Sequence, residues 1–248
     1  MPSQFERFLY SKMPRVGYFC SDISAWVLYG YALLLFLSFK RLKIMRGDMY
    51  RVYGDLQSGN CYKVKLLMQL LGLEHEWVHV DIVAGDTRTP EFTRMNGNEK
   101  IPVLQVGESE FLVESNAILN FLAEGSALLP GSGLDRAKVL QWQFFEQYSH
   151  EPYIAVARFI NKYLGLPESR KEEYLSKQEG GNRALSVMDS HLAGRDYFVG
   201  DSPTIADISL YAYTHVAHEG GFDLSGYQNI VRWLRRIESL PGYCGMTP

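Results

Sequence analysis

Cysteine is scarce in this sequence of 248 residues. The three cysteines, Cys20, Cys61 and Cys244, lie far apart, so they form neither an even-numbered disulfide framework nor a metal-binding pair. His150, His191, His215 and His218 also lack the spacing of metal ligands. We therefore expect no metal, and the simplest location is a reducing compartment, the cytoplasm.

An excess of basic residues is also lacking. The chain carries 25 Lys and Arg against 28 Asp and Glu, a net charge of −3. Residues 1–48 hold seven basic and three acidic residues, a balance of +4, and subtracting this from −3 leaves −7 for the rest. Nucleic-acid binding needs clustered Lys and Arg to neutralise phosphates, so no nucleic acid is expected as a partner.

The body of the chain begins with an α/β pattern. The predicted elements are a strand at 50–53, a helix ending before Gly72, a strand at 75–81, a short helix after Pro90, a hairpin at 103–106 and 110–113, and a helix N-capped by Ser115. A parallel pair followed by an antiparallel hairpin, with helices covering the sheet, is typical of a thioredoxin-like domain. We assign residues 49–127 to it.

A second domain follows a short linker. Residues 128–133 contain Pro130, Gly131 and Gly133, a composition typical of linkers. From 134 to 248 helical periodicity dominates, and the only strand predicted is at 197–199. Domain two is therefore expected to be all-helical.

The run Ser58-Gly59-Asn60-Cys61 lies between the first strand and the first helix. The free N–H groups and partial positive charge of a helix N-terminus would stabilise an anion, such as an ionised sulfur, beside Ser58. Ser58-x-x-Cys61 has the spacing of a dithiol motif, but serine replaces the attacking sulfur, so dithiol exchange within the chain is unavailable. Cys61 shares the apolar helix face with Val64 and Met68, which predicts a buried structural thiol.

Three further runs follow the Ser58 run along the chain: Lys100-Ile101-Pro102, Glu114-Ser115, and Thr204-Ile205-Ala206-Asp207. Together with the Ser58 run they resemble the soluble glutathione transferase family, in its serine-type branch, over about residues 49 to 241. The resemblance implies a thioredoxin-like glutathione-binding domain and a helical domain that supplies the second-substrate site. It also implies glutathione as co-substrate, an electrophilic second substrate, detoxification and a homodimer.

The resemblance assigns the catalytic hydroxyl to Ser58. Glutathione's thiol has a free pKa of about 8.5, and lowering it by about two units needs ~2.7 kcal/mol of anion stabilisation. A charge-assisted hydrogen bond from the Ser58 hydroxyl is worth roughly 1.5–3 kcal/mol, and the helix N-terminus adds about 0.3–1. Asn60 is the alternative donor, through its amide. Ser58 also fits a purely structural role as the helix N-cap.

Glutathione's other groups are assigned by the resemblance to two short runs. Pro102 is expected to be cis, with the Ile101 backbone holding the cysteine of glutathione, while Lys100 either meets the glycine carboxylate or is solvated. Gly97 and Glu99 depart from the proline and glycine that are usual in this loop.

The γ-glutamyl end and the second substrate have their own candidates. Glu114 can accept from the γ-glutamyl ammonium, and the Ser115 hydroxyl with the helix N–H groups can receive its carboxylate. Tyr148 and Tyr153 are expected to line the pocket for an apolar electrophile, and Arg158 to border it.

The first 48 residues admit two interpretations. The run 23–39 is apolar and just long enough to span a bilayer, which needs ~20 residues with a lower limit near ~17. Alternatively, Met49 stands where chains of the resembled family begin, so that residues 1–48 are upstream sequence from an over-long start. We favour the second, and membrane contact is expected only if 23–39 is a real anchor.

Glutathione conjugation is the favoured activity. Glutathione-dependent isomerisation or disulfide reduction would use the same thiolate, and the sequence does not separate them. A non-catalytic relative that keeps the fold as a binding or assembly module is a further alternative, one that the presence of Ser58, Pro102 and Glu114-Ser115 disfavours.

Overall fold

The computed structural model describes residues 50–131 and 133–246, which form one compact unit. The predicted segment at 23–39 lies outside the described residues. Within the described ranges, no helix is both long and apolar enough to cross a bilayer.

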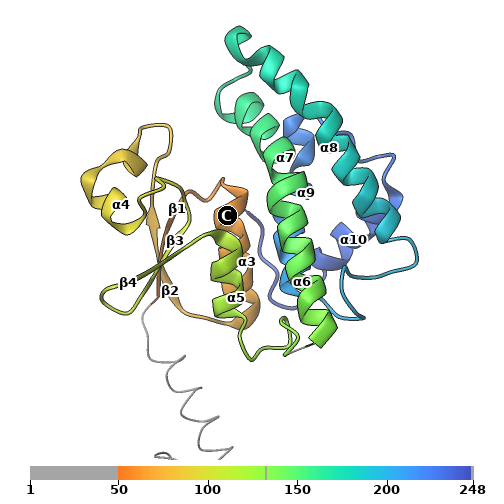
Figure 1. Ribbon diagram of the computed structural model, residues 1–248, viewed down its shortest axis with the longest axis horizontal. Helices are drawn as coiled ribbons and strands as arrows, with labels where there is room; N and C mark the ends of the chain where they lie inside the picture. Colours follow the sequence, from red (N-terminus) through yellow and green to blue (C-terminus); the bar gives the residue numbers. More distant parts are fainter. Residues whose placement is uncertain (1–49, 132, 247–248) are drawn as a thin grey trace, which may run out of the picture. The chain divides into compact units, whose positions relative to one another are not determined.

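Four strands form one sheet in the order β2-β1-β3-β4 (Figure 1). They are β1 (Tyr50–Gly54), β2 (His75–His79), β3 (Val103–Val106) and β4 (Glu110–Val113). β1 pairs with β2 in parallel, whereas β1 with β3 and β3 with β4 pair antiparallel. The predicted parallel pair and hairpin are thus confirmed, and the fold is thioredoxin-like.

Helices cover both faces of this sheet. Helices α3 (Gly59–Leu71) and α5 (Ser115–Leu122) pack on one face, whereas α4 (Pro90–Met95), preceded by the turn η1 (Asp86–Arg88), lies on the other (Figure 1). On the α4 side Phe92 packs with Val80 and Val103 in a small apolar cluster. β1 alternates between buried and half-buried residues, which is the pattern of a strand with two unequal faces.

Local signals set both ends of α3. Ser58 is its N-cap, with extended backbone angles of φ −77° and ψ 126°. Gly72 ends it in the left-handed conformation at φ 63°, and the Leu73 N–H returns to the Met68 carbonyl, as in a Schellman motif. Because α3 lies between the sheet and the helical half, it is buried on more than one side.

Beyond residue 132 the described chain is helical. A nearly continuous run comprises α6 (Gly133–Phe145), the π-helical turn η2 (Glu146–His150), α7 (Glu151–Arg158) and the π-helical turn η3 (Phe159–Tyr163). It is followed by η4 (Glu168–Arg170), α8 (Lys171–His191), α9 (Ile205–Thr214), η5 (Ala217–Gly220) and α10 (Gln228–Glu238). The strand expected at 197–199 is wrong: these residues form bends, because the Phe198 N–H donates to the Asp207 carboxylate instead of to a strand.

The predicted capping box is present at the start of α9. The Thr204 N–H donates to Asp207 Oδ2 over 2.9 Å, and the Ala206 N–H donates to Thr204 Oγ1. Asp207 is fully buried and also accepts from Trp233 Nε1 at 3.0 Å. The box therefore ties α9 to α10, which is a role in folding.

One hydrophobic core runs through both halves of the described chain. It includes Val52, Leu67 and Leu119 from the sheet half, and Ile208 and Trp233 from the helical half. The two halves thus share one core, which fixes the N-terminus of α3 against α7 and α9.

Candidate active site

Ser58 lies at the start of α3 and is almost fully buried. Its Oγ accepts from the Cys61 N–H at 3.5 Å, which uses a lone pair of the oxygen, so the cap itself does not require the O–H. The structural and functional interpretations of this serine are therefore compatible. One hydroxyl can cap the helix and still donate to an anion.

Cys61 is a fully buried thiol, as the sequence predicted. Burial raises its pKa to about 12, although a hydrogen bond from Ser58 acts in the opposite direction. Gly54 is required beside it, since a Cβ there would lie 2.6 Å from the Cys61 sulfur. A thiol with such a pKa is not a nucleophile at neutral pH. Any sulfur chemistry at the start of α3 therefore needs a sulfur from outside the chain.

The Asn60 side chain has a defined orientation. Lys63 Nζ lies 2.8 Å from Asn60 Oδ1, and Ser115 Oγ lies 3.3 Å from the same oxygen. An ammonium has donors and no acceptor, so the atom facing it must be the oxygen. The amide nitrogen consequently points the other way, toward Glu151 Oε1 at 3.4 Å.

A buried ion pair lies next to Asn60. Lys63 Nζ lies 2.8 Å from Glu146 Oε1, and both side chains have no exposed surface. The contact has the distance of an ion pair but not the direction of a hydrogen bond. Glu146 Oε2 accepts in addition from Asn116 Nδ2 at 3.1 Å. Lys63 belongs to the sheet half and Glu146, in η2, to the helical half, so the ion pair joins the two halves next to Asn60.

The loop before β3 has the expected proline geometry. The Ile101–Pro102 bond is cis. Asn96 holds the loop, because its Nδ2 donates to the Lys100 carbonyl at 2.7 Å. Glu99 adopts the left-handed φ of 55°, a conformation that favours glycine. Asn96 thus supplies the loop contacts despite the unusual residues at 97 and 99.

Glu114 and Ser115 begin α5, one residue earlier than the sequence predicted. Glu114, not Ser115, occupies the N-cap position, with φ 68° and ψ 111°. Such angles cost about 1–3 kcal/mol in a non-glycine residue and are concentrated at functional sites. The Ser115 hydroxyl is buried and also lies 3.4 Å from Lys63 Nζ, so Lys63 contacts both Asn60 and Ser115.

A cavity of about 540 Å³ adjoins these groups. Lys100 and Ile101 form one wall, Glu151 and Phe159 of the α7 region another, and Tyr213 of α9 closes it. Ser58 and Asn60 do not line the cavity themselves, and Asn60 reaches its wall through Glu151.

Tyr213 approaches the start of α3 closely. A Cβ on Gly59 would lie 2.6 Å from the Tyr213 ring, so only glycine fits under it. Burial raises the pKa of Tyr213, so its hydroxyl is protonated and able to donate.

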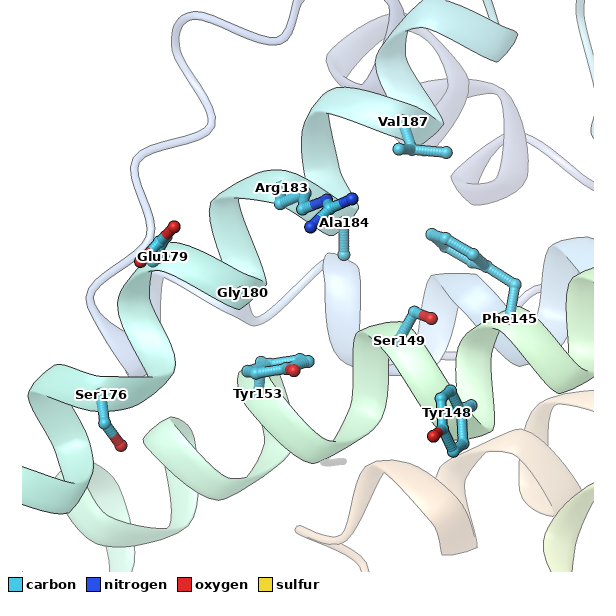
Figure 2. A pocket seen from close by; sticks show the side chains of 10 residues that line it. All are labelled: Phe145, Tyr148, Ser149, Tyr153, Ser176, Glu179, Gly180, Arg183, Ala184 and Val187. Carbon is cyan, nitrogen blue, oxygen red and sulfur yellow. The ribbon is translucent and has the colours of Figure 1, made fainter.

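Tyr148 and Tyr153 line a different cavity, of about 580 Å³, between the α6–α7 run and α8. Figure 2 shows both on the α6–α7 run with Gly180 and Arg183 on the facing helix. Tyr148 is 86% exposed. The two tyrosines that were expected to line the pocket for the electrophile therefore do not line the cavity beside Ile101.

Arg158 is the clearest departure from expectation. It is buried, its Nε donates to Glu219 at 2.6 Å, and another guanidinium nitrogen donates to the Gln57 carbonyl at 2.7 Å. With its donors used in this way it joins the loop before Ser58 to η5, and it does not border either cavity. We do not retain it as a substrate residue.

Sequence reasoning missed Lys63, Glu151 and Tyr213. The periodicity of α3 gave Lys63 no sign of burial, and Tyr213 had no motif around it. Glu151 had a usable signal, since the following Pro152 occupies the first turn of α7 and marks a fresh helix start. Among the residues that the structure describes, no cluster of His, Cys, Asp and Glu is grouped to hold a metal ion.

Comparison with known proteins gives the family. The family description "Glutathione S-transferase, N-terminal domain" matches residues 57–124, and "Glutathione S-transferase, C-terminal domain" matches residues 142–241. Glutathione S-transferase 2 of Anopheles gambiae is 30% identical, over 79% of this chain and 92% of its own length. The chain therefore belongs to the glutathione S-transferase family.

Other similar proteins carry different activities in their names. The disulfide-bond oxidoreductase YfcG of Escherichia coli is 29% identical over 73% of this chain and 87% of its own length. The maleylacetoacetate isomerase of Rhizobium meliloti is 29% identical over 77% and 92%. Identity at this level establishes the family but not the reaction.

Solved structures agree with the fold. A glutathione S-transferase from Pseudomonas fluorescens is 58% identical, with a TM-score of 0.79, covering 81% of this chain and all of the other. A glutathione transferase family member from the same species, solved with two glutathione molecules bound, is 28% identical with a TM-score of 0.69, covering 78% and 90%.

Proposed function

We propose that this protein binds glutathione, stabilises its thiolate at the start of α3 and adds the sulfur to an electrophilic substrate. The observation that carries the proposal is the position of Ser58 as the N-cap of α3, with the Asn60 amide oxygen held by Lys63 in the first turn so that its nitrogen points away from Lys63. Hydrogen-bond donors and a partial positive charge at one point favour an anion there.

The other groups of glutathione can then be assigned to residues around this thiolate site. Lys100 is exposed and free to meet the glycine carboxylate, and the Ile101 backbone can pair with the cysteine. Exposed Glu114 can accept from the γ-glutamyl ammonium, while Ser115 and the α5 N-terminus receive its carboxylate. The second substrate enters the cavity beside Ile101.

The proposal also includes a homodimeric assembly and a cytoplasmic location. Large apolar side chains are exposed on three neighbouring segments in sequence order, namely Phe121 of α5, Phe144 of α6 and Tyr148 of η2. We propose that these side chains form one contact surface of a homodimer, because contiguous exposed apolar surface marks contact sites between proteins. Cytoplasmic glutathione and the free thiols of Cys61 and Cys244 support the cytoplasm as the location and detoxification as the role.

The test is a spectroscopic titration of the thiol of bound glutathione. Removing one charge-assisted donor is expected to raise its pKa by about one to two units, so Ser58→Ala and Asn60→Ala are each measured against the wild type. Thr89→Ala is the matched control, because Thr89 caps α4 through the Phe92 N–H and lies outside the thiol corner. A thiol pKa near 8.5 in the wild-type complex would overturn the proposal.

A second candidate is glutathione-dependent isomerisation or disulfide reduction. Buried Cys61 does not compete as a nucleophile, so a reductase of this kind would rely on the glutathione sulfur alone. Turnover of maleylacetoacetate or of a glutathionyl disulfide, in place of conjugation, would favour it. If Ser58→Ala and Asn60→Ala leave every rate unchanged, a non-catalytic binding module is the better description.

A further inference from the structure

Glu151 is a carboxyl group at the wall of the cavity that no motif assigned. It is the first residue of α7, immediately after the π-helical turn η2, a type of irregularity often found at functional sites. It is half-buried and lines the cavity together with Ile101 and Tyr213. Its Oε1 accepts from Asn60 Nδ2 at 3.4 Å, so it touches the amide at which we place the thiolate.

The surroundings of Glu151 raise its pKa. Burial raises its pKa, and the Glu146 carboxylate of η2 raises it further. Lys63 and Asn60 of α3, and Lys100 of the loop, act in the opposite direction. From α9 the group faces the neutral hydroxyl of Tyr213.

A glutathione thiolate would change this balance. It would bring a second anion close to the carboxylate in a half-buried site, and two like charges at short distance do not both remain ionised. The proton that leaves the thiol therefore has an acceptor nearby, and Glu151 becomes neutral as the sulfur becomes charged.

We propose that Glu151 accepts the thiol proton of glutathione and delivers it to the substrate carbon when the thiolate adds to an α,β-unsaturated carbonyl compound. This inference rests on the proposed function. The sulfur forms a bond to the β-carbon, and the C=C electron pair moves to give an enolate. Glu151 then protonates the α-carbon and returns to the carboxylate, so one proton passes from sulfur to carbon and nothing else is consumed.

The other carboxylates at this cavity are less suited. Glu173 is held by Arg170 through two contacts of 2.8 and 2.9 Å. Glu99 is exposed to solvent. Glu151 alone among these three contacts Asn60, which places its proton next to the reacting sulfur.

The experiment compares two electrophiles. Addition to trans-4-phenyl-3-buten-2-one requires a proton at carbon, whereas displacement of chloride from 1-chloro-2,4-dinitrobenzene requires none. In Glu151→Gln the thiol proton can still pass to solvent, but no carboxyl holds a proton for the α-carbon. The kcat/KM for the addition is therefore expected to fall about 10²- to 10⁴-fold, the usual contribution of a positioned acid, while displacement stays within a few-fold of the wild type. Glu91→Gln is the control, because this exposed carboxyl of α4 does not line the cavity, and it should change neither rate.

A product analysis gives a readout that a structural role would not move. In D₂O the wild type should place deuterium on one face of the α-carbon, and Glu151→Gln should give both faces, as seen by NMR. Glu151→Asp keeps the carboxyl one methylene farther back and should recover part of the addition rate, which also covers the case in which Glu151→Gln fails to fold.

The outcomes distinguish the role of Glu151 from the proposed transferase function. Equal losses for both electrophiles, no loss for either, or a wild type that performs displacement but not addition would each overturn the role of Glu151 and leave the transferase function standing. A wild type that turns over neither electrophile with glutathione would overturn the function and this inference together.

Discussion

Replacing Lys63 by Met is expected to be among the most damaging single changes in this protein. The Lys63 ammonium and the Glu146 carboxylate are both without exposed surface and lie 2.8 Å apart. Methionine has a similar length and no charge, so Lys63→Met leaves Glu146 buried and uncompensated. Breaking a buried ion pair in this way costs about 3–5 kcal/mol, a large share of the ~5–15 kcal/mol by which domains are usually stable.

Urea unfolding followed by tryptophan fluorescence measures this loss. The matched control is Lys65→Met on the same helix, where Nζ donates to the carbonyls of Gly245 and Met246, and a loss of about 1 kcal/mol is expected. The double variant Lys63→Met/Glu146→Gln should recover most of the stability, because it removes both charges and keeps an amide oxygen for Asn116.

The double variant also separates stability from the orientation of Asn60. With the ammonium gone, Asn60 Oδ1 loses its contact at 2.8 Å and the amide is no longer fixed outward. We expect the thiol pKa of bound glutathione to rise even where stability is restored. The reasoning fails if Lys63→Met costs no more than Lys65→Met, or if the second substitution restores nothing.

Two further predictions concern pH and packing. Burial lowers the pKa of His150 from 6.5 to about 3, so the unfolded chain binds the proton first and stability should fall as pH drops from 6.5 toward 3, by up to ~1.4 kcal/mol per pH unit from this group. The urea midpoint of the His150→Gln variant should decline less steeply with falling pH than that of the wild type. The control, His218→Gln at an exposed histidine, should follow the wild type. Parallel curves for all three proteins would contradict the role of His150 in acid unfolding. Gly59→Ala should lower the free energy of unfolding by about 1–3 kcal/mol, because its Cβ would meet the Tyr213 ring at 2.6 Å. Gly97→Ala, with open space around it, is the thermal-unfolding control, and equal melting temperatures for the two variants would refute the argument.

The sequence by itself determined the features that depend on close neighbours along the chain. Ser58 caps α3, Gly72 ends it, and Thr204 and Asp207 form the box that starts α9. Each rests on hydrogen bonds between residues a few positions apart, so a short window contains both partners. The order of strands and helices followed from periodicity in the same way, and it was sufficient for the fold and for the corner at Ser58.

Tertiary structure alone decided which side chains meet at that corner. Lys63 is buried because α3 is enclosed by the sheet and by α9, an enclosure that the sequence of α3 does not encode. The π-helical turn at Glu146–His150 changes the rotation of the helix per residue, so an uninterrupted helical pattern misplaces everything after it. Glu151 reaches the cavity beside Ile101, while Tyr153, two residues further on and therefore on the opposite side of α7, lies on the side of α8.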